Sequence, residues 1–254
     1  MKFKIFSAII FIAFIIVACS FKKKEAVHFN VPFEPIAVIE LFTSQGCSSC
    51  PPADALLAET IADATKNNNK IFALSFHVDY WNRLGWADPF SNAAYSARQN
   101  DYVTAFGLDG AYTPQMIVNG NKEFIGSDKT ALATSLTNAL NTKAAINFSA
   151  LNVAYSDAKS VKVQYAIDGN FSGATINFAL VSLSETTVVK RGENGGHTLT
   201  NENVVHQFIT KNAAVSGEIE FTNNNVVKEN MAIIVFVQQE KDKKIVGAAM
   251  AKIN

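Results

Sequence analysis

The sequence predicts an α/β fold, a mixed sheet flanked by helices, followed by an antiparallel β-sandwich. Two observations support this expectation: the order of the elements, and a change near residue 145 from a pattern of strands and helices to short strand-like runs alone. Up to about residue 142, apolar runs and stretches with helical spacing follow one another as β-α-β-α-β-β-α, which is typical of a mixed sheet with helices on both faces. We therefore expect two domains, at residues 34–142 and 145–254.

The first domain opens with the near-continuous apolar run Ile36–Phe42, which indicates a strand buried on both faces. An apolar stripe at helical spacing follows Pro51-Pro52, and Asn119-Gly120 between two short apolar runs predicts a hairpin. Ser127 is the expected cap of the last helix. The remaining predicted elements are a strand at 71–76, a helix at 91–106, and short strands at 115–118 and 122–125.

The second domain shows alternation of apolar and polar residues, as at Val161, Val163, Tyr165 and Ile167. Further strand-like runs occur at 176–180, 204–209, 219–221, 231–237 and 245–250, separated by turns rich in Gly and Asn. Seven or so short strands without a helix between them are typical of a β-sandwich.

Composition excludes some classes of function. Of the 254 residues, 48% are hydrophobic, and 22 basic residues balance 22 acidic ones. A nucleic-acid-binding protein would need a basic face, so no nucleic-acid partner is expected. Intrinsic disorder would need low hydrophobicity and high net charge, so the chain should fold.

The N-terminus predicts export. Lys2 and Lys4 precede an apolar run of about 14 residues, which is too short to span a bilayer comfortably and ends in Ile16-Val17-Ala18-Cys19. These four residues resemble the lipobox of bacterial lipoproteins, whose Cys becomes the lipidated N-terminus. We expect a signal peptide at 1–19, a lipid anchor on Cys19 and a tether at 20–33, which would place the protein in the bacterial cell envelope facing the periplasm. The alternative is an ordinary signal peptide with an incidental Cys.

Cys47 and Cys50 are the two cysteines that remain once Cys19 is assigned to lipid. In an oxidising compartment they can persist as a disulfide. A strand, a short loop, Cys-x-x-Cys and a helix is the arrangement that thiol–disulfide exchange requires, because peptide N–H groups near the helix start favour a thiolate. On this reasoning Cys47 is the nucleophile and Cys50 the resolving thiol.

Two longer segments carry a resemblance to a known family. Thr113-Pro114-Gln115-Met116-Ile117-Val118 resembles the segment that places a Pro, usually in cis, opposite the motif in the thioredoxin superfamily. The segment 40–54, which includes the motif, and the segment 75–81 are similar to a secreted bacterial family of thioredoxin-like proteins, domain of unknown function 1223. The resemblance implies a thioredoxin-like fold for residues 34–142 and places Thr113 and Pro114 beside the motif.

The resemblance also implies a role for Glu40, which resembles the buried carboxylate that assists proton transfer in thioredoxins. One extra residue separates Glu40 from the first Cys, and strand alternation turns such an offset side chain to the other face unless a bulge absorbs it. A second departure is the double proline after Cys50. It predicts a helix start near Pro51 or Pro52, farther from Cys47 than in the superfamily pattern.

His77 and Asp79 follow the second predicted strand. The carboxyl ends of parallel strands share one edge of a sheet, so both residues should lie near Cys47 and Thr113. We interpret them as a candidate proton relay, and His77 also as a candidate ligand for a soft metal. The alternative is a histidine that fixes its own loop and an aspartate that serves the turn.

Three functions fit these observations. The leading hypothesis is an exported, membrane-tethered thiol–disulfide oxidoreductase that acts on exported protein thiols and disulfides, is reset by an unknown redox partner, and needs no cofactor. The second is a copper-binding protein with Cys47, Cys50 and perhaps His77 as ligands. The third is a scaffold with a structural disulfide, whose β-sandwich makes the contacts.

Overall fold

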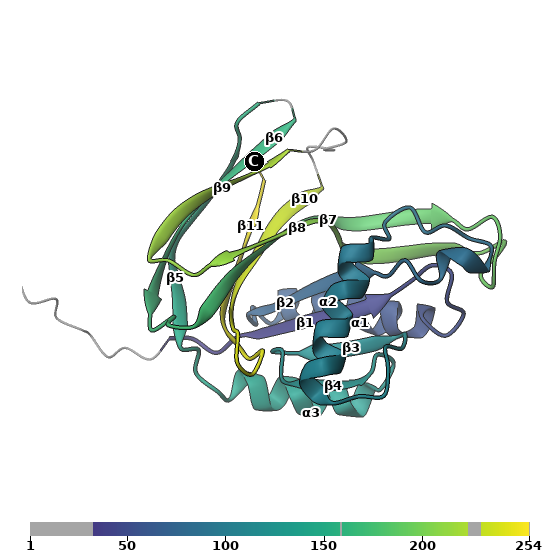
Figure 1. The fold of residues 1–254 in the computed structure, drawn as a ribbon, viewed down its shortest axis with the longest axis horizontal. Helices are drawn as coiled ribbons and strands as arrows, with labels where there is room; N and C mark the ends of the chain where they lie inside the picture. Colours follow the sequence, from purple (N-terminus) through teal and green to yellow (C-terminus); the bar gives the residue numbers. More distant parts are fainter. Residues whose placement is uncertain (1–32, 158, 223–229, 254) are drawn as a thin grey trace, which may run out of the picture. The chain divides into compact units, whose positions relative to one another are not determined.

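The computed structural model describes residues 33–157, 159–222 and 230–253 (Figure 1). The predicted signal peptide, Cys19 and the tether up to residue 32 lie outside the described residues, so the expected lipid anchor stays a prediction. Within the described part, no helix is both long enough and apolar enough to cross a membrane.

The described residues form eleven strands, three α-helices and one short 3-10 helix. In chain order these elements are β1 (Ala37–Thr43), α1 (Pro51–Lys66), β2 (Ile71–His77), the 3-10 helix Asn82–Leu84, α2 (Ala93–Phe106), β3 (Gln115–Val118), β4 (Lys122–Ile125), α3 (Lys129–Leu140), β5 (Ile146–Tyr155), β6 (Ser160–Gly169), β7 (Ala174–Val188), β8 (Thr198–Asn212), β9 (Ser216–Thr222), β10 (Met231–Gln239) and β11 (Ile245–Lys252).

One large mixed sheet runs through the fold, with strand order β11-β10-β7-β8-β2-β1-β3-β4. β1 pairs in parallel with β2 and antiparallel with β3. The two halves of the sheet join where β2 pairs in parallel with β8, at Ser75 and Val204. Strands from the first and the second half of the chain therefore share one sheet, and the long β7–β8 hairpin passes close to the first strands (Figure 1).

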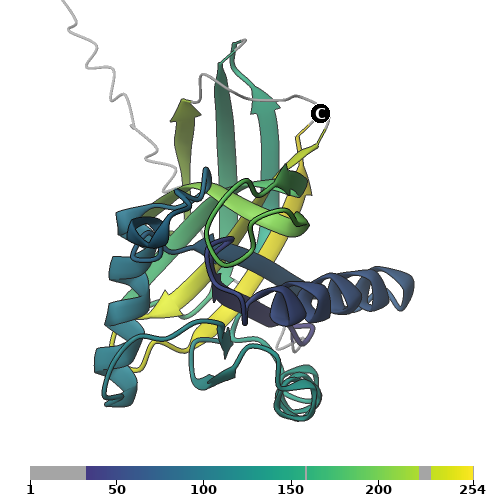
Figure 2. The same cartoon turned by 90° about the vertical axis from the view of Figure 1, so that its right-hand side faces the viewer.

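Side-chain alternation gives the sheet two apolar faces. On one face, α1 and α3 pack on β1 residues such as Ile39 and Leu41. On the other face, α2 packs on Val38 and Phe42, together with residues of β7, β8 and β10. Figure 2 shows α1 and α2 on opposite sides of the sheet. A separate three-stranded sheet, β5-β6-β9, packs against β7 and β10 and forms a third core.

The predicted fold class is wrong. We expected a helix-flanked thioredoxin-like fold for 34–142 followed by a β-sandwich, but β1 to β4 are half of an eight-stranded mixed sheet, and the protein is mostly β. The elements of the first half lie close to their predicted places, but the sheet does not end at β2, and β7 and β8 are longer than the predicted runs at 176–180 and 204–209. Because β8 continues that sheet, β7 and β10 become central strands, and residues 231–238 are buried on both faces.

Candidate functional site around the Cys47–Cys50 disulfide

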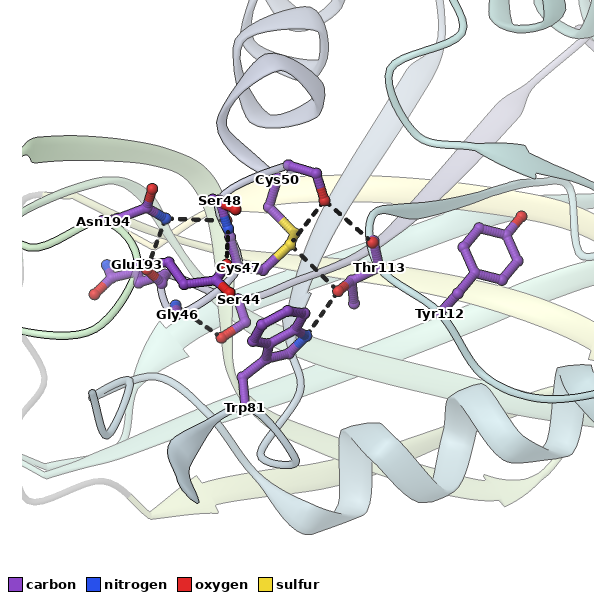
Figure 3. Close-up of a disulfide and its surroundings, with 12 residues drawn as sticks. Ser44, Gly46, Cys47, Ser48, Cys50, Trp81, Tyr112, Thr113, Glu193 and Asn194 are labelled. Carbon is purple, nitrogen blue, oxygen red and sulfur yellow. Dashed lines mark hydrogen bonds between the residues drawn. A yellow bond between two sulfur atoms is a disulfide. The ribbon is translucent and has the colours of Figure 1, made fainter. Parts of the chain in front are cut away.

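Cys47 and Cys50 form a disulfide at the start of α1 (Figure 3). β1 ends at Thr43, a turn follows, and α1 begins at Pro51 directly after Cys50. Both cysteines are fully buried, whereas Ser48 and Ser49 between them are exposed. The helix start agrees with the one expected from the double proline: Pro51 and Pro52 have no N–H, and the N–H groups of Ala53 and Asp54 bond to the Cys50 carbonyl. The first turn of α1 thus directs no N–H group to Cys47.

Two hydroxyl groups lie at the Cys47 sulfur instead (Figure 3). Thr113 Oγ1 donates to Cys47 Sγ at 3.4 Å, and Ser49 Oγ lies 3.3 Å from the same sulfur. Trp81 Nε1 donates to Thr113 Oγ1 at 2.8 Å, so the Thr113 proton is free to point at the sulfur. The Thr113–Pro114 peptide is cis. The structure therefore brings together the motif and Thr113-Pro114, as the sequence predicts.

A loop from the second half of the chain covers the motif. It joins β7 to β8 and spans residues 189–197. Asn194 Nδ2 donates to the carbonyls of Gln45 and Cys47, at 3.0 and 2.9 Å, and Glu193 Oε2 accepts from the Ser48 N–H at 3.0 Å. Sequence reasoning did not single out Glu193 or Asn194, because these contacts join residues 145 to 149 positions apart.

A buried polar cluster lies on the α1 face of the sheet, below the disulfide. Asp54 is one helical turn after Cys50, and helical side chains lean toward the preceding turn. Thr43 and His77 are register partners on β1 and β2, and both are buried. Within the described residues, Asp54 Oδ1, Thr43 Oγ1 and His77 Nε2 make no hydrogen bond, although all three atoms are buried. Such a group of unsatisfied polar atoms is rare in protein interiors.

The charges of this cluster are set by burial and by one ion pair. Burial raises the pKa of Asp54 to about 6, which outweighs the lowering by the charge of His77 and by the Thr43 and Asn201 side chains. His77 Nδ1 lies 2.7 Å from Asp88 Oδ2. Burial alone would lower the pKa of His77, but the Asp88 carboxylate reverses this and raises it. For Asp88 the directions are opposite: burial would raise the pKa of this carboxyl, but His77 and two backbone N–H groups hold it below its usual value.

Glu40 and Asp79 are not part of this cluster. Glu40 is on the α2 face, because Ile39 and Leu41 on either side of it face α1. There it accepts from Arg98 and Tyr102. Asp79 accepts from Ser96 Oγ at 2.5 Å and so ties the loop after β2 to α2. Of the sequence-predicted residues, Cys47, Cys50, Thr113 and Pro114 lie together, and His77 lies beside Asp54 in the buried cluster.

Sequence reasoning passed over Asp54. The signal was present, since Asp54 falls between Ala53 and Leu56 on the apolar stripe of α1, where an acidic residue is out of pattern. The soft-metal hypothesis gains no support from the geometry: in the described part of the chain, no three His, Cys, Asp or Glu side chains converge as a metal site would require.

Comparisons with known proteins give a family and a structural relative. A family model described as "Protein of unknown function (DUF1223)" matches residues 38–238. A crystal structure of a protein from Agrobacterium tumefaciens is 26% identical, with a TM-score of 0.62, over 85% of this chain and 94% of that one. A domain of the outer membrane lipoprotein Omp28 from Porphyromonas gingivalis is 18% identical, covering 44% of this chain and 89% of its own, and its TM-score of 0.28 is too low to carry an argument. No curated protein matches.

Proposed function

This chain belongs to the DUF1223 family of proteins of unknown function, and we propose that it is an exported, membrane-tethered thiol–disulfide oxidoreductase acting on protein thiols and disulfides. The observation that carries the proposal is the Cys47–Cys50 disulfide, which has the Thr113 hydroxyl as a donor at the Cys47 sulfur and, one turn beyond Cys50, a buried carboxyl with one oxygen that makes no hydrogen bond. A purely structural disulfide needs neither feature.

The proposed cycle transfers two electrons. In the reduced protein, the Cys47 thiolate attacks one sulfur of a partner disulfide; a bond forms between the two proteins, and the second partner sulfur leaves as a thiolate. The Cys50 thiolate then attacks Cys47 Sγ. This restores the Cys47–Cys50 disulfide and releases the first partner sulfur as a thiolate. The partner is reduced and this protein is oxidised; the reverse sequence oxidises a partner dithiol.

Thr113 supports the first step. Hydrogen bonds to a thiolate stabilise it relative to the thiol and lower its pKa. The Trp81 N–H occupies an acceptor position on Thr113 Oγ1, so the Thr113 hydroxyl can donate to Cys47 without turning. The Thr113 hydroxyl takes the role that the N–H groups of a helix start would otherwise fill.

Asp54 supports the second step. Cys50 must lose its proton before it attacks, and a buried carboxylate nearby can accept it. With a pKa of about 6, Asp54 is mostly ionised at neutral pH, yet it binds a proton far more readily than an ordinary carboxylate. We assign to Asp54 the proton-accepting role that the resemblance implied for Glu40.

Export and tethering rest on the sequence alone. The apolar run after Lys4 and the lipobox-like ending at Cys19 support a lipid anchor at the membrane surface, which would hold the disulfide among exported proteins. Replacing Cys19 by Ser should then release the mature protein from the membrane fraction without changing the redox properties of Cys47 and Cys50.

Trapping tests the exchange reaction. A Cys50→Ala variant cannot resolve a mixed disulfide, so we expect it to accumulate partner proteins linked to Cys47 when it is expressed with its export signal. These adducts should disappear on reduction and should be lacking in the matched Cys47→Ala/Cys50→Ala variant. The proposal fails if Cys50→Ala traps nothing and the Cys47 thiol of that variant has a pKa near the free value of about 8.5.

A further inference from the structure

The covering loop at 189–197 places a carboxylate beside the proposed nucleophile. The loop is well organised by its own backbone: Val189 and His197 pair with each other, and the Gly195 N–H bonds to the Gly192 carbonyl. Gly192, at φ +77°, packs against Trp86, where a Cβ would approach the Trp86 Cβ to 3.1 Å. The loop therefore packs in a defined position against the segment that follows β2.

Asn194 fixes the loop to the motif itself. It is buried, and its two hydrogen bonds reach the carbonyls of Gln45 and Cys47. Gln45 is held in turn by Asn201 and Trp86. With Asn194 fixed in this way, the neighbouring residue Glu193 stands over the exposed Ser48 (Figure 3).

Glu193 brings a negative charge to the residue next to Cys47. Its Oε2 accepts from the Ser48 N–H at 3.0 Å, and hydrogen bonds from the Ser48 hydroxyl and N–H lower the pKa of Glu193. Glu193 is therefore ionised at neutral pH. It is exposed and forms no ion pair with any residue that the structure describes.

A carboxylate in this place opposes a thiolate on Cys47 in two ways. It occupies the N–H of Ser48, the residue that follows Cys47, and it repels a second negative charge. A cationic group on the partner would pair with Glu193 and remove both effects as the partner docks. An acidic group would add to the repulsion, and water and salt would screen either interaction because Glu193 and Ser48 are exposed.

We propose that Glu193 is a specificity-determining residue that selects partners with Lys or Arg beside the cysteine that exchanges with Cys47. This inference rests on the proposed function, since it concerns the partner of the same exchange reaction. The chemistry is the cycle given above, with a cationic peptide disulfide as the oxidant that accepts two electrons from Cys47 and Cys50.

The test uses two disulfides that differ in charge. Reduced protein is mixed at low ionic strength with the symmetrical disulfides of acetyl-Lys-Cys-Lys-amide or acetyl-Glu-Cys-Glu-amide, and each rate is divided by the rate with bis(2-hydroxyethyl) disulfide, a neutral disulfide. We expect the wild-type protein to prefer the cationic disulfide by about ten-fold and the preference to shrink in high salt. Glu193→Gln should reduce the preference to about two-fold, and Glu193→Lys should reverse it.

A matched control is Glu220→Gln. Glu220 is an exposed glutamate on β9 that accepts from Ser156. β9 belongs to the three-stranded sheet, away from the disulfide, so replacing Glu220 changes the net charge equally without altering the site. It should keep the wild-type preference. An unchanged preference in Glu193→Gln and Glu193→Lys, with exchange still proceeding, would overturn this inference alone. Failure of the wild-type protein to reduce either disulfide would instead overturn the proposed function.

Discussion

Two buried carboxyl groups, on opposite faces of the same sheet, differ in how they are satisfied. Glu40 on the α2 face accepts from Arg98 Nε at 2.5 Å, from Arg98 Nη2 at 3.0 Å and from Tyr102 at 2.5 Å. Asp54 on the α1 face keeps Oδ1 without a partner among the described residues, and its pKa is raised to about 6. A buried carboxylate with a full set of donors holds the fold together, whereas one with an oxygen left unbonded remains able to exchange a proton.

The largest expected effect lies on the α2 face. Arg98→Met removes the partner of Glu40 and leaves an uncompensated charge in the core, so we expect the free energy of unfolding to fall by about 3–5 kcal/mol. Arg98 also stacks on the Phe208 ring, 4.8 Å from its centroid, and methionine retains part of that packing. Urea unfolding measures the loss.

The control for this prediction removes both charges. Glu40→Gln/Arg98→Met should recover much of the lost stability, because no ion is then left unpaired. The rate at which dithiothreitol reduces the Cys47–Cys50 disulfide in folded protein should be unchanged in both variants. A reduction rate that falls together with stability would show that the two faces do not differ as we infer.

The next largest effect concerns Asp54 and pH. Its folded-state pKa of about 6 lies above its ordinary value of 3.8, so the folded protein binds more protons than the unfolded chain between these values. The free energy of unfolding should therefore fall as the pH rises from about 4 to about 6, by on the order of 3 kcal/mol from this group. Asp54→Asn should remove that contribution.

The measurement is urea unfolding of the wild-type protein and of Asp54→Asn at several pH values between 4 and 7. The difference between the two proteins isolates Asp54 from other groups, including Asp88, whose lowered pKa contributes stability that is lost as the pH falls. Asp63→Asn, a change on the exposed side of the same helix, is the matched control. If wild-type and Asp54→Asn curves run parallel, the carboxyl of Asp54 does not titrate as inferred.

The α1 and α2 faces of the sheet also show how far the sequence predicts the site. The strand that carries Glu40 and the motif that follows it are evident from apolar runs and spacing. The face of Glu40 depends on alternation, and the structure contains no bulge between Glu40 and Thr43 that would turn Glu40 toward the disulfide: β1 pairs in unbroken register with β2. The extra residue before Cys47 thus keeps Glu40 on the α2 face, and Asp54 lies on the face of the motif.

The parts that sequence could not predict are long-range. The single parallel pair between Ser75 and Val204 decides that the sheet continues past β2, and no local pattern specifies such a contact. The unbroken apolar run in β10 was a signal, because a strand buried on both faces belongs in the middle of a sheet that is covered twice. In the sequence, Glu193 and Asn194 are typical of a turn. Their contacts with the motif arise only because the β7–β8 hairpin places them beside Cys47.

The smallest expected effect tests the hydroxyl contact at Cys47. Trp81→Phe removes the N–H that bonds to Thr113 Oγ1, so the Thr113 hydroxyl is no longer held toward the sulfur. We expect a loss of about 1 kcal/mol in the free energy of unfolding, and about a two-fold lower thiolate fraction at Cys47 in the reduced protein.

The matched control is Trp86→Phe, which removes the hydrogen bond from Trp86 to Gln45 but leaves Thr113 in place. Ultraviolet titration of the reduced proteins measures the thiolate. A shift of equal size in both variants would mean that the Trp81–Thr113–Cys47 chain has no special effect on the acidity of Cys47, and that the α1 face owes its chemistry to Asp54 alone.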